Sequence, residues 1–122
     1  MLGLIKILIF SGIVTVFSSN DKYNPNPSLA CTHKIINDNQ LLAAHRNLPC
    51  GTKLLLLNPR TKKKVEVVVL DRGPYGKFKD GTYKAVLDIS LAAQKGLKHN
   101  GKENLIIIIK RIGWPQKRKP NS

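Results

Sequence analysis

Three short aliphatic runs limit most strongly what this chain can fold into. They are residues 53–57 (KLLLL), 64–70 (KVEVVVL) and 105–111 (LIIIIKR). Each has the length of a β-strand and is bounded by polar residues, and the Asn58-Pro59 pair after the first run predicts a turn that joins the first two strands. The unbroken third run predicts a strand that is buried on both faces.

A short helix is expected between these strands. Residues 90–97 (SLAAQKGL) offer Ser90 as an N-terminal cap and Gly96 as the residue that ends the helix. A chain of 122 residues has room for one domain. Because many strands in a small domain need their edges paired, we expect a mostly β fold, a compact barrel with one or two short helices.

The N-terminal segment is predicted to lie outside this domain. Residues 1–19 carry Lys6, then an apolar stretch and two serines, which is the order of a secretory signal peptide. The stretch is shorter than the about 20 residues of a membrane span, although an uncleaved anchor is the alternative. Cleavage after Ser18 fits the flanking residues better than cleavage after Ser19. Residues 20–29 are then a polar linker, residues 30–112 the domain, and residues 113–122 a basic, disordered tail.

The chain has two cysteines, Cys31 and Cys50. In a small exported protein an even number of cysteines predicts a disulfide, and closing a loop of roughly 20 residues would stabilise the fold by about 3 kcal/mol. Two buried free thiols are the alternative. Neither cysteine directly follows the signal segment, so we expect a secreted or periplasmic protein of the cell envelope that is not a lipoprotein.

The chain is strongly basic, with 21 Lys and Arg against 7 Asp and Glu and a formal net charge of +14. Such a surface favours polyanions, which include nucleic acid, anionic lipid and the acidic polymers of a bacterial envelope. Export argues against nucleic acid as a specific partner. The histidines and cysteines show no ligand spacing, which predicts no metal site. We expect a monomer that needs no cofactor.

The second strand runs directly into Asp71 and Arg72. Because side chains alternate along a strand, Val65, Val67, Val69 and Asp71 are predicted to share one face. If the valines point inward, Asp71 lies at the barrel mouth, where partial loss of water favours a protonated carboxyl group that can act as a general acid. Alternatively, Asp71 caps the following turn through backbone amides, with Arg72 as its ion partner.

Three segments of the chain match one family in order. They are Ala43-Ala44-His45-Arg46 with Leu48-Pro49-Cys50-Gly51-Thr52, then Asp71-Arg72-Gly73-Pro74-Tyr75, then Asp88-Ile89-Ser90 with Ala92 and Ala93. Over roughly residues 28–112 the chain resembles the rare lipoprotein A (RlpA)-like family of double-psi β-barrels, whose relatives include barwin and the expansins. The resemblance implies a six-stranded double-psi β-barrel. It also implies the cysteine-bearing variant of the family, in which Cys31 pairs with Cys50.

RlpA-like enzymes are endolytic peptidoglycan lytic transglycosylases, which cut the glycan without water and leave a 1,6-anhydromuramyl end. The resemblance implies that Asp71 serves as acid and then as base, so that a second, nucleophilic carboxylate is not required. Asp88 matches an aspartate that expansin-like relatives need for wall loosening, and His45 matches a histidine that lines the RlpA-like site. Peptidoglycan or a related wall polysaccharide is the implied partner.

Further contacts to the glycan are expected from Arg72 and from three loop aromatics, Tyr75, Phe78 and Tyr83, whose rings can stack on sugars. Each candidate also has a structural interpretation. Asp88 can help to order the start of the helix. His45 can hold the loop that follows Ala44, and exposed aromatic residues are common in loops.

The chain departs from the family at two places. RlpA enzymes commonly carry a glutamate eleven residues before the histidine, and this position is Lys34 here. The segment between Asp71 and Asp88 is longer than in most relatives, and the extra residues form a basic, aromatic loop at 76–84. The missing carboxylate favours an alternative function, a non-catalytic expansin- or barwin-like module that binds or loosens the wall. A secreted cationic defence protein of barwin type is a third, weaker interpretation.

Overall fold

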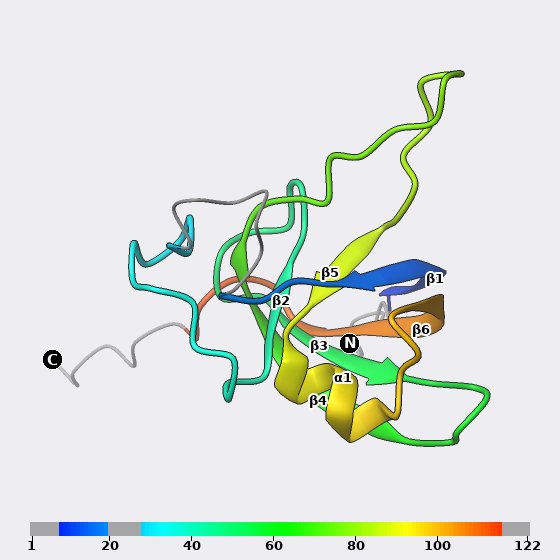
Figure 1. Cartoon of the computed structure of the whole chain (residues 1–122). Coiled ribbons are helices and arrows are strands. Elements are labelled where there is room, and N and C mark those ends of the chain that lie inside the picture. The colour runs from blue at the N-terminus through cyan, green and yellow to red at the C-terminus, as the bar shows by residue number, and fades with distance from the viewer. Residues whose placement is uncertain (1–7, 20–27, 116–122) are drawn as a thin grey trace, which may run out of the picture.

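The computed structural model describes residues 8–19 and 28–115. These residues form six strands and one short helix (Figure 1), namely β1 (Leu8–Val16), β2 (Leu42–Ala44), β3 (Lys53–Leu57), β4 (Lys64–Asp71), β5 (Leu87–Ile89), α1 (Leu91–Leu97) and β6 (Lys102–Arg111). Over these residues no helix has the length and apolar character needed to cross a membrane. The predicted mostly β fold is confirmed.

The six strands close into a barrel in the order β1-β5-β2-β4-β3-β6. Strands β1 and β5 run parallel, as do β2 and β4, and the other neighbours are antiparallel. Closure pairs both edges of every strand, which a small sheet cannot achieve otherwise. The predicted six-stranded double-psi β-barrel is confirmed, with one helix.

The barrel interior is filled by side chains from every strand. Most are aliphatic and nearly inaccessible to solvent: Val14, Ala43, Leu54, Leu56, Val67, Val69, Leu87, Ile89, Leu105 and Ile107. A second cluster covers the outside of β2 and β4, where the loop at residues 28–36 contributes Leu29 and Ile36 against Leu42. The loop that leads to the first cysteine is therefore packed onto the barrel.

The predicted strand pairing of β3 with β4 is confirmed, from Lys53↔Val68 to Leu57↔Lys64. The prediction that β6 is buried on both faces is wrong. Leu105 and Ile107 are fully buried, whereas Ile106 and Ile108 are only half-buried. In a barrel only one side of a strand faces the interior, so the outer side of β6 keeps contact with solvent.

The first strand lies where a signal peptide was expected. Strand β1 pairs with β6 from Leu8↔Ile109 to Thr15↔Lys102 and with β5 at its other edge, and Val14 is fully buried in the core. The prediction that residues 1–19 lie outside the domain core is therefore wrong for β1. Cleavage after Ser18 stays a prediction, but it would remove one strand of six and leave β5 and β6 with unpaired edges.

The segments that flank the domain also differ from expectation. Ser19 donates two hydrogen bonds to Asp38, from its backbone N at 2.9 Å and from Oγ at 2.7 Å. Leu29, expected in the linker, is buried. The tail begins in an ordered way, because Gly113 N donates to Thr52 Oγ1 at 3.0 Å. Residues 20–27 and 116–122 of the expected linker and tail lie outside the described residues.

Helix α1 begins as predicted and ends differently. Ser90 Oγ accepts a hydrogen bond from Ala93 N at 3.4 Å, which confirms Ser90 as the cap. The helix continues through Gly96 to Leu97, and Lys98 provides the left-handed C-cap with φ of 49°. A Cβ atom at Gly96 would lie 2.7 Å from Val65 Cγ1. This glycine therefore allows the helix to approach β4 closely and does not end it.

Candidate functional site

Asp71 is the last residue of β4, and a register shift decides which way it faces. Ala43 pairs with Val69, but the next residue, Ala44, pairs with Asp71. A shift of this kind redirects the side chains that follow it. The prediction that the valines point inward is confirmed for Val67 and Val69, which are buried. The prediction that Asp71 shares their face is wrong, because Asp71 pairs with an alanine on the opposite face of β2 and is half-buried.

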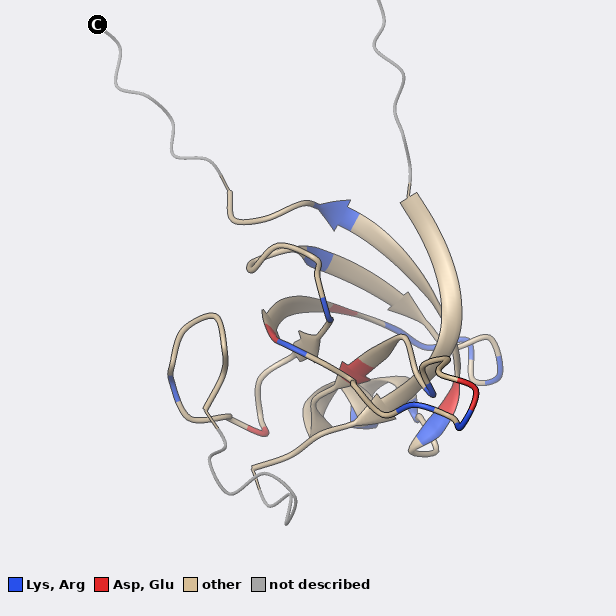
Figure 2. Cartoon of the chain, turned by 90° about the horizontal axis from the view of Figure 1, so that it is seen from above, with Lys and Arg blue, Asp and Glu red and all other residues tan. Residues whose placement is uncertain are grey.

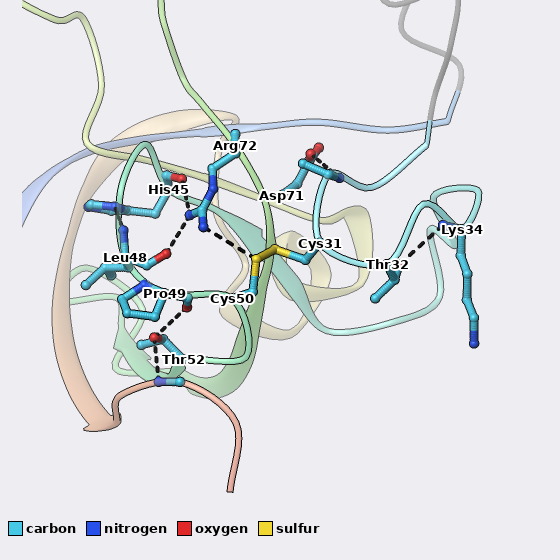
Figure 3. The surroundings of a disulfide bond; sticks show 12 residues. Cys31, Thr32, Lys34, His45, Leu48, Pro49, Cys50, Thr52, Asp71 and Arg72 are labelled. Atoms are coloured by element: carbon cyan, nitrogen blue, oxygen red, sulfur yellow. Dashed lines mark hydrogen bonds between the residues drawn. A yellow bond between two sulfur atoms is a disulfide. The ribbon is translucent and has the colours of Figure 1, made fainter.

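A backbone amide from a distant loop holds the Asp71 carboxylate. Asp71 Oδ1 accepts a hydrogen bond from Ala30 N at 2.9 Å (Figure 3). The next residue, Cys31, donates its own amide to Leu70 O at 2.9 Å and forms the predicted disulfide with Cys50. The disulfide prediction is confirmed. The amide that orients Asp71 comes from this disulfide-linked loop and not from the turn that follows Asp71.

Arg72 turns away from the carboxylate beside it. Its guanidinium donates to the carbonyls of His45, at 3.2 Å, and of Leu48, and approaches Cys50 Sγ at 3.4 Å (Figure 3). These contacts fasten the loop at residues 45–50 to the end of β4. The alternative in which Arg72 is the ion partner of Asp71 is therefore not what the structure shows. Its contact with substrate stays a prediction.

His45 directly follows β2, and its backbone joins the end of β4. His45 N donates a hydrogen bond to Asp71 O at 3.1 Å. Its ring nitrogen Nδ1 accepts from Asn47 N at 3.1 Å and from Leu48 N at 3.0 Å. Burial, with smaller contributions from Arg46 and Arg72, lowers the pKa of His45. The ring is therefore neutral near pH 7 and carries its proton on Nε2, which makes it a hydrogen-bond donor.

Asp88 reaches the same region from β5. Its backbone pairs with Ala44 on one side and with Thr15 on the other, and Thr15 Oγ1 donates to Asp88 Oδ1. Ala44 therefore has Asp71 as its partner on β4 and Asp88 as its partner on β5. The backbones of the three residues predicted to be catalytic therefore lie near the end of β2, but their side chains do not all converge. The His45 ring packs edge-on against Phe10 of β1, at 6.1 Å between ring centres, and lies on the other side of Arg72 from the Asp71 carboxylate (Figure 3). Thr15 was missed because it lies in the segment interpreted as a signal peptide, although the run of β-branched residues in GIVTV is typical of a strand.

The long loop after Asp71 forms a projecting arm, residues 73–86 (Figure 1). Lys77 and Tyr83 form an isolated antiparallel bridge, and Phe78 N donates to Thr82 O at 2.8 Å. Arg46 fastens the base of the arm, since it donates to the carbonyls of two arm residues at 2.6 and 2.9 Å and lies 3.7 Å from the centre of the Tyr83 ring. Arg46 was not predicted as a site residue, although it directly follows the matched histidine.

The three predicted aromatics of the arm differ in accessibility. Tyr75 and Phe78 are exposed by 60% and 51%. Tyr83 is also exposed, but Arg46 covers its ring and Lys77 lies 4.9 Å from the ring centre. Tyr83 therefore contributes to the structure of the arm. Lys84 lies 5.7 Å from the centre of the Phe78 ring, and Tyr75 is the most exposed of the three rings.

Lys34 lies apart from the predicted catalytic residues. It is exposed, and its side chain extends away from Asp71 and the disulfide (Figure 3). A shallow hollow in the described surface lies elsewhere, beside α1, and none of the predicted site residues lines it. The described residues include no group of three His, Cys, Asp or Glu that could hold a metal ion. Basic residues are spread over several loops and strand ends (Figure 2).

Comparison with known proteins gave relatives of one kind. No family model matches. The chain is 33% identical over 90 residues to a probable endolytic peptidoglycan transglycosylase RlpA of Nostoc sp., with 74% of this chain and 22% of the relative covered. It is 44% identical over 61 residues to the protein of the same name from Aquifex aeolicus, with coverages of 50% and 24%. It is 37% identical over 62 residues to the endolytic peptidoglycan transglycosylase RlpA of Pasteurella multocida, with coverages of 51% and 19%.

A solved structure supports the fold alone. Cerato-platanin 3 from M. perniciosa superimposes with a TM-score of 0.54 at 12% identity, over 84% of this chain and 95% of that one. The chain spans about a fifth to a quarter of the length of the curated relatives named above.

The matching barrel, the disulfide and the sequence identity agree with one another: over its barrel, this chain belongs to the RlpA-like double-psi β-barrel family.

Proposed function

We propose that this barrel acts on the glycan strands of peptidoglycan as an endolytic lytic transglycosylase, outside the cytoplasm. The names of the RlpA relatives support the reaction and the substrate class. The Cys31–Cys50 disulfide supports a location in an oxidising compartment such as the periplasm or the cell exterior. The basic surface would favour approach to an anionic wall.

Asp71 is the proposed acid and base. Its proton passes to the glycosidic oxygen as the bond from that oxygen to C1 of the muramic acid breaks. The resulting carboxylate then accepts the proton of the muramyl 6-hydroxyl as O6 bonds to C1, which closes the 1,6-anhydro ring without water. The observation that carries this assignment is the hydrogen bond from Ala30 N to Asp71 Oδ1 at 2.9 Å. This bond fixes the orientation of the carboxyl group, and in the proposed reaction Oδ2 is the oxygen that gives and accepts the proton.

Neighbouring residues have supporting roles in this proposal. Neutral His45 donates from Nε2 to the sugar, since Nδ1 already accepts two backbone amides. Asp88 and Thr15 form a hydrogen-bonded pair on the other side of Ala44 and bind sugar hydroxyls. Tyr75 and Phe78 on the arm supply exposed rings for the glycan.

A non-catalytic wall-binding module is the second candidate, and Lys34 favours it. This lysine stands where RlpA enzymes commonly carry a glutamate. A lysine cannot act as a carboxylate. In this alternative Asp71, Asp88 and the aromatics hold the glycan without cutting it.

Products released from purified sacculi separate the two candidates. The full, oxidised chain would be compared with Asp71→Asn and with Glu66→Gln, a matched removal of an exposed carboxylate from the same strand. Mass spectrometry of the soluble fraction should show anhydro-muropeptides from the unchanged chain and from Glu66→Gln, with a loss of at least about 100-fold for Asp71→Asn.

Each other outcome has a defined meaning. Retention of all three proteins on sacculi without released product would support the binding module. Equal product from Asp71→Asn would remove Asp71 from the mechanism. Absence of both retention and product would overturn the proposed function.

A further inference from the structure

The single tryptophan of the chain lies close against a glycine at the Asp71 end of the barrel. Trp114 is 53% exposed. A Cβ atom at Gly51 would lie 2.4 Å from Trp114 Cδ2, so the indole approaches the backbone of this glycine more closely than any other residue type would allow. Gly51 also has a φ of +86°, which favours glycine. The ring is therefore supported by backbone and still widely exposed.

Hydrogen bonds of the residues just before the tryptophan hold this position. Gly113 N donates to Thr52 Oγ1 at 3.0 Å, and Arg111 Nε donates to Gly113 O at 3.0 Å. The same arginine donates from Nη2 to Gly51 O at 3.2 Å. A ring that is held before it binds loses less conformational entropy on binding than a mobile one.

The disulfide-linked loops that contain Cys31 and Cys50 contact both Asp71 and Trp114. Gly51 N donates to Val69 O at 2.8 Å, only two residues before Asp71 on β4. Cys50, beside Gly51, is bonded to Cys31, and the residue before Cys31 supplies the amide that holds Asp71. Two residues of a strand span about 7 Å. Asp71 and the glycine that supports the indole therefore lie at the same end of the barrel.

We propose that Trp114 is a stacking platform for a sugar ring of the same glycan strand on which Asp71 acts. The pyranose rings of N-acetylhexosamines have faces of C–H groups, which an exposed indole can cover while the hydroxyl groups remain in water. This inference rests on the proposed function and adds a binding position for the ligand. It also explains why the beginning of the basic tail folds back onto the loop at residues 49–52.

The single tryptophan makes the inference directly measurable, because all indole fluorescence comes from Trp114. The full chain with Asp71→Asn, which keeps the glycan intact, would be titrated with soluble β-1,4-linked oligosaccharides of N-acetylglucosamine and N-acetylmuramic acid. We expect a saturable blue shift of the emission as the sugar displaces water from the ring. Trp114→Ala should weaken retention on sacculi by roughly three- to tenfold, and Trp114→Phe by less.

Ile112→Ala is the matched control, since Ile112 is an exposed apolar residue two positions away, and it should bind like the unchanged chain. Equal thermal midpoints for all variants exclude a folding effect. Unchanged emission from bound protein, or unchanged retention of Trp114→Ala, would overturn the stacking platform. The proposed function would still stand if the unchanged chain released product from sacculi. If no variant binds glycan and none releases product, both proposals fail.

Discussion

The two ends of the barrel use arginine in different ways. At the Glu103 end, formed by the turn at 58–61, the end of α1 and the start of β6, Arg60 Nε lies 2.9 Å from Glu103 Oε2. At the Asp71 end, formed by residues 45–52 and 71–74, Arg72 is bonded to carbonyls and not to the acid beside it. Where arginine meets a carboxylate, the acid is a structural group. Where arginine binds backbone, the acid is held by a backbone amide and has no arginine partner among the described residues.

The Glu103 end is a closed hydrogen-bond network. Glu103 Oε1 accepts from Asn58 Nδ2 at 2.8 Å, and Asn58, which is fully buried, also donates to Leu97 O at 3.0 Å. The hydrogen bonds from Arg60 lower the pKa of Glu103 most, and those from Asn58 and the Asn100 amide lower it further. Desolvation opposes this effect, and the resulting pKa is about 2. This network ties β3, α1 and β6 together.

Strand β1 joins both ends, so its removal should have the largest effect. A chain that starts at Ser19 loses the buried Val14 and the whole ladder between β1 and β6. We expect no cooperative unfolding transition in circular dichroism and loss of the dispersed amide signals in NMR. The full chain is the control. A cooperative melt of the shortened chain would show that β1 is dispensable and would restore the signal-peptide interpretation.

Loss of the disulfide should affect the Asp71 end selectively. With both Cys31 and Cys50 changed to serine, the free energy of unfolding should fall by about 3 kcal/mol, measured by urea denaturation. Amide exchange should increase near Ala30 and Gly51, which the disulfide links, and less at the Glu103 end. Equal exchange at both ends would show that the two ends are not independent.

Asn58→Ala tests the opposite end. Removal of its side chain leaves Leu97 O and Glu103 Oε1 with one hydrogen bond fewer, in a buried position. We expect a loss of about 2 kcal/mol in the free energy of unfolding, with unchanged product release per folded molecule. Loss of product at temperatures where the variant is folded would contradict the separation of the two ends.

Acid should weaken the Glu103 end through the titration of its carboxylate. Because the pKa of Glu103 is lowered from 4.5 to about 2, its contribution to stability is present above the unfolded value and is lost as the pH falls toward 2. Glu103→Gln should lower stability at pH 7 by about 1 kcal/mol, since solvent reaches Arg60 and weakens the pair. Urea melts between pH 7 and 2 should show a smaller pH dependence for this variant. Parallel curves would refute the linkage.

Lys34→Glu should have the smallest effect. The side chain is exposed and directed away from Asp71 (Figure 3). We expect a change in stability within about 0.5 kcal/mol and no gain in product release from sacculi. A clear gain in product would show that a carboxylate at this position acts at the Asp71 end after all.

Several features could be predicted from local patterns. The two runs that became β3 and β4 pair through the turn expected for them, and Ser90 caps α1. The disulfide followed from the number of cysteines, and the family resemblance directed attention to the three residues that surround the end of β2. These features depend on residues that are close in sequence or on a motif that identifies the fold.

Other features depended on contacts between distant segments. The apolar stretch at residues 8–16 is short enough to suit a strand or a signal peptide, and only pairing with β5 and β6 distinguishes the two. The face of Asp71 could not follow from alternation, because the register shift between β2 and β4 is invisible in either strand alone. Glycine is a residue type typical of helix ends, but Gly96 instead allows close packing of the helix against Val65.

The amino-acid sequence by itself determined a β-rich domain, its strand runs, its helix cap and the residue types at the matched motifs, because propensity, alternation and turn chemistry are local. Only the tertiary structure decided that β1 completes the barrel, that Ala30 holds Asp71 and that Trp114 rests on Gly51. The physical reason is that closure of the barrel sets which distant strands are neighbours, and those neighbours decide which hydrogen-bond partner each polar group finds.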